Sequence, residues 1–98
     1  MRIDLVLKYL CLIKSRSIAK NLCEQGRVLV GGHPARSSAT VRVGDRVTVH
    51  FAHHALTVWI DAVPEKQLSK SSALTYYHAV ETPDAERLED SADPLEDL

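Results

Sequence analysis

The chain has 98 residues, 45% of them hydrophobic, which gives room for one small domain with a modest core but not for a large enzyme cleft between two lobes. Its formal net charge of -1 conceals an uneven distribution of charge between the two halves of the chain. Residues 1–50 hold nine Lys and Arg against three acids, a net of +6, while residues 51–98 hold three against ten, a net of -7. A basic half of this kind is typical of proteins that bind a polyanion.

The first predicted element is an amphipathic helix near the N-terminus. Its apolar residues recur with the period of a helix face: Ile3, Val6, Leu7, Leu10 and Ile13. Asp4 and Lys8 lie one turn apart, and we expect them on the polar side as a weakly supporting pair. The apolar run 6–13 is too short to span a bilayer and has no cleavage site after it, so we expect a cytoplasmic protein.

A second helix is predicted to begin after Ser15 and to end at Gly26. The Ser15 hydroxyl can accept a hydrogen bond from an unpaired amide of the first turn, and Gly26 can take the left-handed conformation that often ends a helix. The expected buried stripe of this helix consists of Ile18, Ala19, Leu22 and Cys23. The two cysteines, Cys11 and Cys23, lie at helical positions among aliphatic residues, which favours buried reduced thiols over a disulfide.

From Val28 onward the apolar residues alternate, which predicts strands. Gly31-Gly32 indicates a hairpin, and Gly44-Asp45 indicates a second turn before two further strands around 46–51 and 56–60. After Pro64, a Lys- and Ser-rich link leads to a predicted short helix over 73–80. Ser71 or Ser72 is expected to cap this helix, and Leu74 and Tyr77 to pack it on the sheet.

These elements predict an α+β fold in which two N-terminal helices pack on a small, mainly antiparallel sheet, with a short C-terminal helix. The expected divisions are a domain at 1–63, a linker and short helix at 64–80, and a tail at 81–98. The tail holds eight acids, one Arg and no aromatic residue, so we expect most of it to be disordered.

Basic residues gather around the second predicted helix. Arg16 and Lys20 are one turn apart and project in nearly the same direction, with Lys14 just before the helix and Arg27 just after it. The hairpin could bring a further group alongside, made of Arg36, Ser37 and Ser38. Guanidinium groups and amides bind phosphate oxygens, so this surface suits a nucleic-acid backbone. The alternative is an ordinary solvated helix face.

Five short motifs in order make residues 2–60 resemble the S4 domain, a small RNA-binding module found in a ribosomal protein, pseudouridine synthases and tyrosyl-tRNA synthetases. They are the following segments: Arg2-Ile3-Asp4, Lys14-Ser15-Arg16-Ser17, Gln25-Gly26-Arg27-Val28, Val30-Gly31-Gly32 and Val43-Gly44-Asp45. The opening triplet and the ending LSKSSALTYYHAV resemble the small stand-alone RqcP family of bacterial ribosome-associated quality control. The chain departs from this family in its Gly31-Gly32 hairpin, where Asn-Gly is usual, and in its longer acidic tail.

The resemblance implies a function in RNA binding rather than catalysis. Members of this family bind the split large ribosomal subunit, contact 23S ribosomal RNA and peptidyl-tRNA, hold the tRNA in the P site, and work with the alanine-tailing factor RqcH. Carried over to this chain, the resemblance makes Arg2 and Arg16 the expected essential RNA contacts. The supporting contacts would be Lys14, Lys20, Arg27, Arg36 and Ser38. We expect no cofactor and a monomer.

Three other functions are considered. The five histidines lack partners at metal-ligand spacing, and no nucleophile motif or phosphate-binding loop is present, so neither a metal site nor an enzyme is expected. A related heat-shock S4 protein, which recycles free large subunits carrying a nascent chain, is the nearer alternative. A protein-interaction adaptor that acts through its acidic tail is the alternative from another class.

Overall fold

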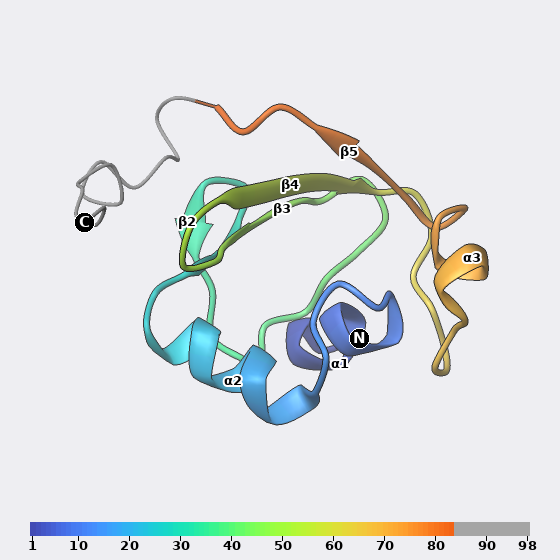
Figure 1. Cartoon of the computed structure of the whole chain (residues 1–98), viewed down its shortest axis with the longest axis horizontal. Helices are drawn as coiled ribbons and strands as arrows, with labels where there is room; N and C mark the ends of the chain where they lie inside the picture. The colour runs from blue at the N-terminus through green and yellow to red at the C-terminus, as the bar shows by residue number, and fades with distance from the viewer. Residues whose placement is uncertain (84–98) are drawn as a thin grey trace.

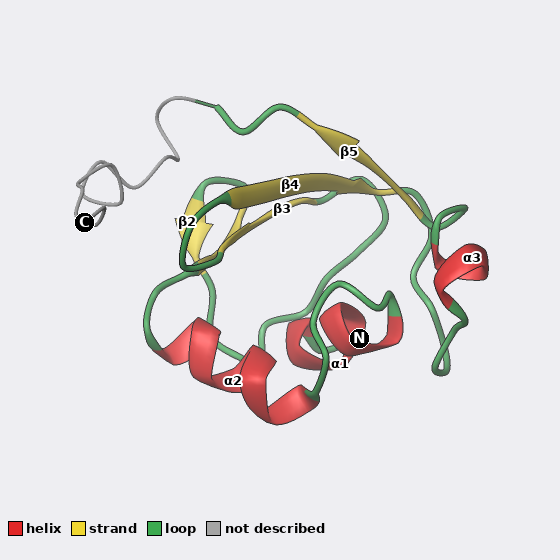
Figure 2. Cartoon of the chain, in the orientation of Figure 1, coloured by secondary structure: helices red, strands yellow, loops and turns green. Residues whose placement is uncertain are grey.

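Two helices cover one face of a five-stranded antiparallel sheet in the computed structural model, which describes residues 1–83 (Figure 1). The helices are α1 (Ile3–Tyr9) and α2 (Arg16–Glu24), and a short α3 (Lys70–Ala73) lies near one end of the sheet (Figure 2). The strands are β1 (Val28–Val30), β2 (His33–Pro34), β3 (Arg46–His50), β4 (Ala55–Ile60) and β5 (Tyr77–Val80), in the spatial order β2-β1-β3-β4-β5. The predicted α+β architecture is confirmed.

The core lies between α1 and the sheet. All five residues of the predicted α1 stripe are buried, with Ile3, Val6 and Leu10 fully excluded from solvent. They join one cluster with the inward-facing residues of β3 and β4, such as Val47 and Val58, which are directly paired. Burying aliphatic side chains of this size contributes on the order of 1.5–3 kcal/mol each. The helical period of the first segment therefore predicted the main core contact.

The ends of α2 are set by the two residues that the sequence indicates. The Ser15 hydroxyl accepts a hydrogen bond from the Ile18 amide at 3.2 Å. At the other end Gly26 has a φ of +74°, and the amides of Gly26 and Arg27 donate to the carbonyls of Cys23 and Leu22. This is the Schellman arrangement, in which a left-handed residue lets the chain reverse while the last carbonyls stay paired. It turns the chain directly from α2 into β1.

The same arrangement ends α1, although no glycine is present. Cys11 has a φ of +61°, and the amides of Cys11 and Leu12 donate to the carbonyls of Lys8 and Leu7, each at 3.0 Å. Its thiol donates to the carbonyl of Leu68 at 3.2 Å. Cys11 is half-buried, not fully buried as predicted, and both cysteines are free thiols.

The C-terminal segment corrects one prediction. A short helix exists, but it ends at Ala73 and is capped by Ser69, whose hydroxyl accepts from the Ser72 amide at 3.2 Å. Residues 77–80 of the predicted helix instead form β5, which pairs with β4. Strand β4 would otherwise present a row of unpaired backbone groups, and a fifth strand satisfies them. Leu74, expected to pack on the sheet, is 62% exposed.

The link before α3 is fixed to the end of α1. The Gln67 side chain accepts a hydrogen bond from Lys8 Nζ at 2.7 Å and donates to the Lys8 carbonyl at 3.2 Å. The Leu68 amide donates to the Tyr9 carbonyl.

Residues 84–98, which make up most of the predicted acidic tail, lie outside the described part of the chain. Within residues 1–83 there is no helix with the length and hydropathy that crossing a membrane requires.

Candidate nucleic-acid interface

The two arginines expected to be essential share one carboxylate. Arg2 precedes α1 and Arg16 opens α2, yet both guanidinium groups bind Asp4. Arg2 donates from Nε to Asp4 Oδ1 at 3.3 Å and from Nη2 to Oδ2 at 3.1 Å, while Arg16 donates from Nε to Oδ2 at 3.3 Å. The carboxylate is 1% exposed, whereas the two arginine side chains are 45% and 48% exposed. The fold thus brings together two cations that lie far apart in sequence.

This arrangement corrects the predicted position of Asp4. The sequence suggested a solvent-exposed pair with Lys8, but Asp4 is buried and Lys8 binds Gln67 instead. A functional grouping was therefore missed. The signal available in the sequence was weak: Asp4 stands directly after a core residue and only two positions from an arginine, which is compatible with burial beside that arginine.

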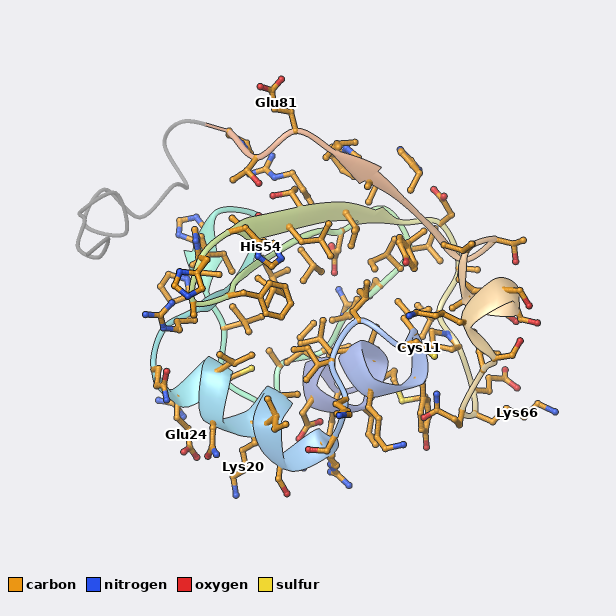
Figure 3. All side chains as sticks on the ribbon, in the orientation of Figure 1. Cys11, Lys20, Glu24, His54, Lys66 and Glu81 are labelled. Atoms are coloured by element: carbon orange, nitrogen blue, oxygen red, sulfur yellow. The ribbon has the colours of Figure 1, made fainter. Side chains whose placement is uncertain are left out.

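The exposed side of α2 carries the next group of cations. Lys14 and Lys20 are exposed, and Figure 3 shows Lys20 projecting from the side of α2 that faces away from the sheet. The first turn of α2 contains no acid, so the partial positive charge of the helix N-terminus adds to the charges of Lys14 and Arg16. Ile18, predicted to be buried, is 45% exposed on this helix. This end of α2 is therefore a region of positive potential.

The loop after β2 lies against the N-terminus of α1 and the C-terminal end of α2. The carbonyls of Ser37 and Ala39 accept hydrogen bonds from the first amides of α1, at 3.3 Å from Asp4 and 2.7 Å from Ile3. Arg36 and Ser38 are exposed on this loop. The loop and the C-terminal end of α2 line an open groove of about 520 Å³, formed by Cys23, Glu24, Gly26, Pro34, Ala35, Arg36, Ser37 and Ser38. The hairpin does bring this loop beside α2, as expected.

Arg27 has different surroundings from the other predicted contacts. It is half-buried, and its Nη1 donates to the carbonyls of His50 and Phe51 at 3.3 and 3.4 Å, at the end of β3. Its guanidinium therefore holds the start of β1 against the end of β3. An arginine bound in this way has fewer donors to offer to a phosphate than Arg16 or Lys20.

Two buried ionisable side chains, Cys23 and His50, have pKa values shifted towards their neutral forms. Burial, with a smaller contribution from the charge of Asp4 and then of Glu24, raises the pKa of Cys23 to about 11, so its thiol stays protonated at neutral pH. Burial, and then the charge of Arg27, lowers the pKa of His50 below 6.5. In the described part of the chain, no three His, Cys, Asp or Glu side chains are grouped so that they could hold a metal ion.

Taken together, these positions suit a negatively charged backbone. Exposed cations surround the N-terminus of α2, and arginines offer paired donors that match phosphate oxygens. Serine hydroxyls on the adjacent loop can donate to phosphate or ribose oxygens. None of the described aromatic side chains is part of this group, so the contacts that it offers are to backbone oxygens rather than to stacked bases.

The comparisons with known proteins agree with this geometry. The sequence profile of the S4 domain matches residues 1–47, which contain both helices, the hairpin and the start of β3. The fold and the cation cluster thus define an S4-domain protein. Heat Shock Protein 15 of Vibrio cholerae, solved as a trimer, superposes with a TM-score of 0.77 and 28% identity over 82% of this chain and 81% of that one.

Relatives that match most of the chain identify the family within the S4-domain proteins. The RQC P-site tRNA stabilizing factor of Halalkalibacterium halodurans is 42% identical over 79% of this chain and 86% of its own length. The factors of the same name from Bacillus subtilis and Streptococcus pneumoniae are 36% and 33% identical, over 88% and 93% of their lengths. The chain belongs to the family of RQC P-site tRNA stabilizing factors, whose members are RNA-binding factors and not enzymes.

Proposed function

We propose that this protein stabilises a tRNA in the P site of the large ribosomal subunit during ribosome-associated quality control. The observation that carries the proposal is the Arg2–Asp4–Arg16 cluster, because it presents two half-exposed guanidinium groups from the starts of α1 and α2 on one surface. The function for which the relatives are named, P-site tRNA stabilisation, requires a surface that binds RNA backbone, and this cluster has that chemistry.

The proposed interface includes the other exposed cations around the cluster. Lys14 and Lys20 extend it along α2, and Arg36 and Ser38 extend it onto the loop after β2. Arg27 would support the interface from within the fold, since its guanidinium already binds the β3 carbonyls. Five exposed cations would then neutralise about five phosphates, which is enough to make binding strongly salt-dependent.

The finer partners are also proposed. The RNA contacts would be to 23S ribosomal RNA and to a peptidyl-tRNA left on the split subunit, in the cytoplasm, where the factor would act with an RqcH-like tailing factor. The described exposed apolar residues come from separate segments of the chain: Ile18, Val43, Trp59 and Leu74. The proposed oligomeric state is a monomer, in contrast to the trimer named for Heat Shock Protein 15.

Co-sedimentation with purified large subunits tests the proposal. Wild type and Arg16→Ala would be compared on subunits with and without peptidyl-tRNA, at two salt concentrations. We expect salt-sensitive binding that peptidyl-tRNA strengthens and that Arg16→Ala loses. Arg16→Ala removes one of the two cations that pair with the buried Asp4, so it should lower stability, while the two hydrogen bonds from Arg2 to Asp4 remain and should keep the domain folded. Equal weak binding of both proteins to all subunits would exclude the proposed interface.

The structural similarity to Heat Shock Protein 15 favours one second candidate, a factor that displaces the tRNA to recycle the subunit. Puromycin reactivity separates the two functions, because puromycin accepts the nascent chain only from a tRNA in the P site. Stabilisation predicts that added protein preserves or raises the puromycin-reactive fraction of peptidyl-tRNA. Displacement predicts that the fraction falls as protein is added.

The acidic C-terminal residues allow a further control. A chain ending at Pro83 keeps every cation of the proposed interface. We expect it to bind large subunits as tightly as the full chain, or more tightly, because seven of the eight acids after Val80 are removed. Loss of protein partners with unchanged RNA affinity would instead favour the adaptor function.

A further inference from the structure

Asp4 is the one buried carboxylate in the described part of the chain, and its burial needs an explanation. It is 1% exposed, although it stands on α1 close to the surface where RNA is proposed to bind. Removing a carboxylate from water is costly unless cations and hydrogen bonds compensate it. In addition, a negative charge at this place repels a phosphate backbone. A residue that is costly in both respects points to a role that an uncharged residue cannot fill.

The contacts of Asp4 indicate that role. Its two oxygens bind Arg2 through Nε and Nη2 and bind Arg16 through Nε. Arg2 therefore meets the carboxylate side by side, in the bidentate geometry that fixes both distance and orientation. Arg16 uses only Nε, so the four N–H groups on its terminal nitrogens take no part in this contact. One carboxylate thus fixes the orientation of two guanidinium planes that come from two helices.

Such fixation matters because arginine side chains are flexible. A free arginine on a helix surface loses its rotamer freedom when it binds, and this loss weakens binding. A side chain that is already held in place loses less. The chain segment that carries Asp4 is itself rigid, since the amides of Ile3 and Asp4 donate to the carbonyls of Ala39 and Ser37. The carboxylate is therefore a fixed point against which both arginines are oriented.

We propose that Asp4 is the positioning residue of the interface, holding Arg2 and Arg16 in the orientation that binds RNA phosphates. The proposal rests on the proposed function, because it assumes that these two arginines contact RNA. It assigns a negatively charged residue a favourable effect on binding a polyanion. A carboxylate that did not position the arginines would only repel the RNA and weaken its binding. Whether removing the charge of Asp4 weakens or strengthens RNA binding therefore decides between the two roles.

Asp4→Asn tests which of these occurs. Asparagine keeps the size and one acceptor oxygen but removes the charge, so net charge rises by one. Positioning predicts that affinity for large subunits carrying peptidyl-tRNA falls by about tenfold, the equivalent of one charge-assisted contact. The slope of log affinity against log salt should stay unchanged or become steeper, because no cation is lost. A carboxylate that only repels the RNA predicts tighter binding instead.

Glu24→Gln is the matched control. It makes the same change of charge on an exposed side chain of α2, which Figure 3 shows projecting near Lys20, and Glu24 forms no ion pair with Arg2 or Arg16. We expect this variant to bind as tightly as wild type or more tightly. Weaker binding by Asp4→Asn together with unweakened binding by Glu24→Gln supports the positioning role. Equal or tighter binding by both variants overturns it.

Arg16→Lys provides the test if Asp4→Asn does not fold, which the fluorescence of Trp59 would report. Lysine keeps the charge on a half-exposed side chain but cannot bind the carboxylate through Nε and present paired donors outward. We expect a loss of about tenfold, against less than about twofold for Lys20→Arg. Wild-type affinity in Arg16→Lys would overturn the proposal. Failure of the wild-type protein to bind any subunit would contradict the proposed function itself. If Arg16→Ala loses binding but Asp4→Asn and Arg16→Lys do not, the proposed function stands and only the positioning role of Asp4 is contradicted.

Discussion

Arg27 and Lys20 look alike in the sequence, since each is a cation on or next to the second helix, but their surroundings in the structure predict opposite effects. Lys20 is exposed on the side of α2 that faces away from the sheet, whereas the guanidinium of Arg27 binds the carbonyls of His50 and Phe51. Replacing each by alanine should therefore separate binding from stability. Lys20→Ala should change RNA binding, and Arg27→Ala should change folding.

The expected magnitudes follow from the contacts. Each neutralised phosphate contributes about 0.7 to the salt slope on single-stranded and about 0.9 on duplex nucleic acid, so five exposed cations give a slope of roughly -3.5 to -4.5. Lys20→Ala should reduce its magnitude by about 0.7–0.9. The two hydrogen bonds of Arg27 are long, at 3.3 and 3.4 Å. Because such bonds are weak for a charged donor, we expect Arg27→Ala to cost about 1–2 kcal/mol of stability.

Two measurements on the same variants check this. Binding to purified large subunits at four salt concentrations gives the slope, and urea unfolding followed by the fluorescence of Trp59, the single tryptophan, gives stability. In a domain of this size 1 kcal/mol corresponds to about 4–8 °C in melting temperature. If Arg27→Ala lowers the slope as much as Lys20→Ala does and leaves stability unchanged, the reasoning from the carbonyl contacts is refuted.

Three further outcomes are expected. Ser15→Ala should cost about 1 kcal/mol in thermal unfolding because the Ile18 amide loses its cap, while Ser17→Ala, exposed in the first turn, should change little. Because burial lowers the pKa of His50, the unfolded chain takes up its proton first, so the urea midpoint should fall as pH drops below about 6.5, and less steeply in His50→Asn. Cys23, whose pKa is raised to about 11, should react with iodoacetamide at pH 7.5 only after urea unfolds the protein; labelling of Cys23 itself in the folded chain, separately from the half-buried Cys11, would contradict its burial.

The parts of the fold that could be predicted are those with a local physical signal. The apolar period of α1, the cap at Ser15 and the left-handed glycine at Gly26 each act within a few residues, and each is confirmed. The Gly31-Gly32 hairpin is another such signal, since both glycines have positive φ and the flanking strands pair. These features depend on backbone sterics and hydrogen bonds that are present in the segment itself.

The errors arose where distant contacts decide the structure. Residues 77–80 are a strand because β4 offers an edge to pair with, and nothing in the local sequence reveals that edge. Asp4 was placed on the polar side of α1 because its i,i+4 neighbour is Lys8, whereas its actual partners are Arg2 and, twelve residues away, Arg16. The basic residues of the proposed interface were named from the sequence, but the carboxylate that joins Arg2 and Arg16 was visible only in the fold.

The positions of Met1 and Glu81 affect where a tag or fluorophore should be attached to the protein for such experiments. Met1 is fixed beside the cluster, since its carbonyl accepts from the Val41 amide at 2.9 Å and the next residue is Arg2. A tag or fluorophore added before Met1 would therefore emerge next to the arginines. Glu81, near the other end of the described chain, projects from the side of the sheet away from α1 and α2 (Figure 3). A probe attached at position 81 would therefore point away from the two helices.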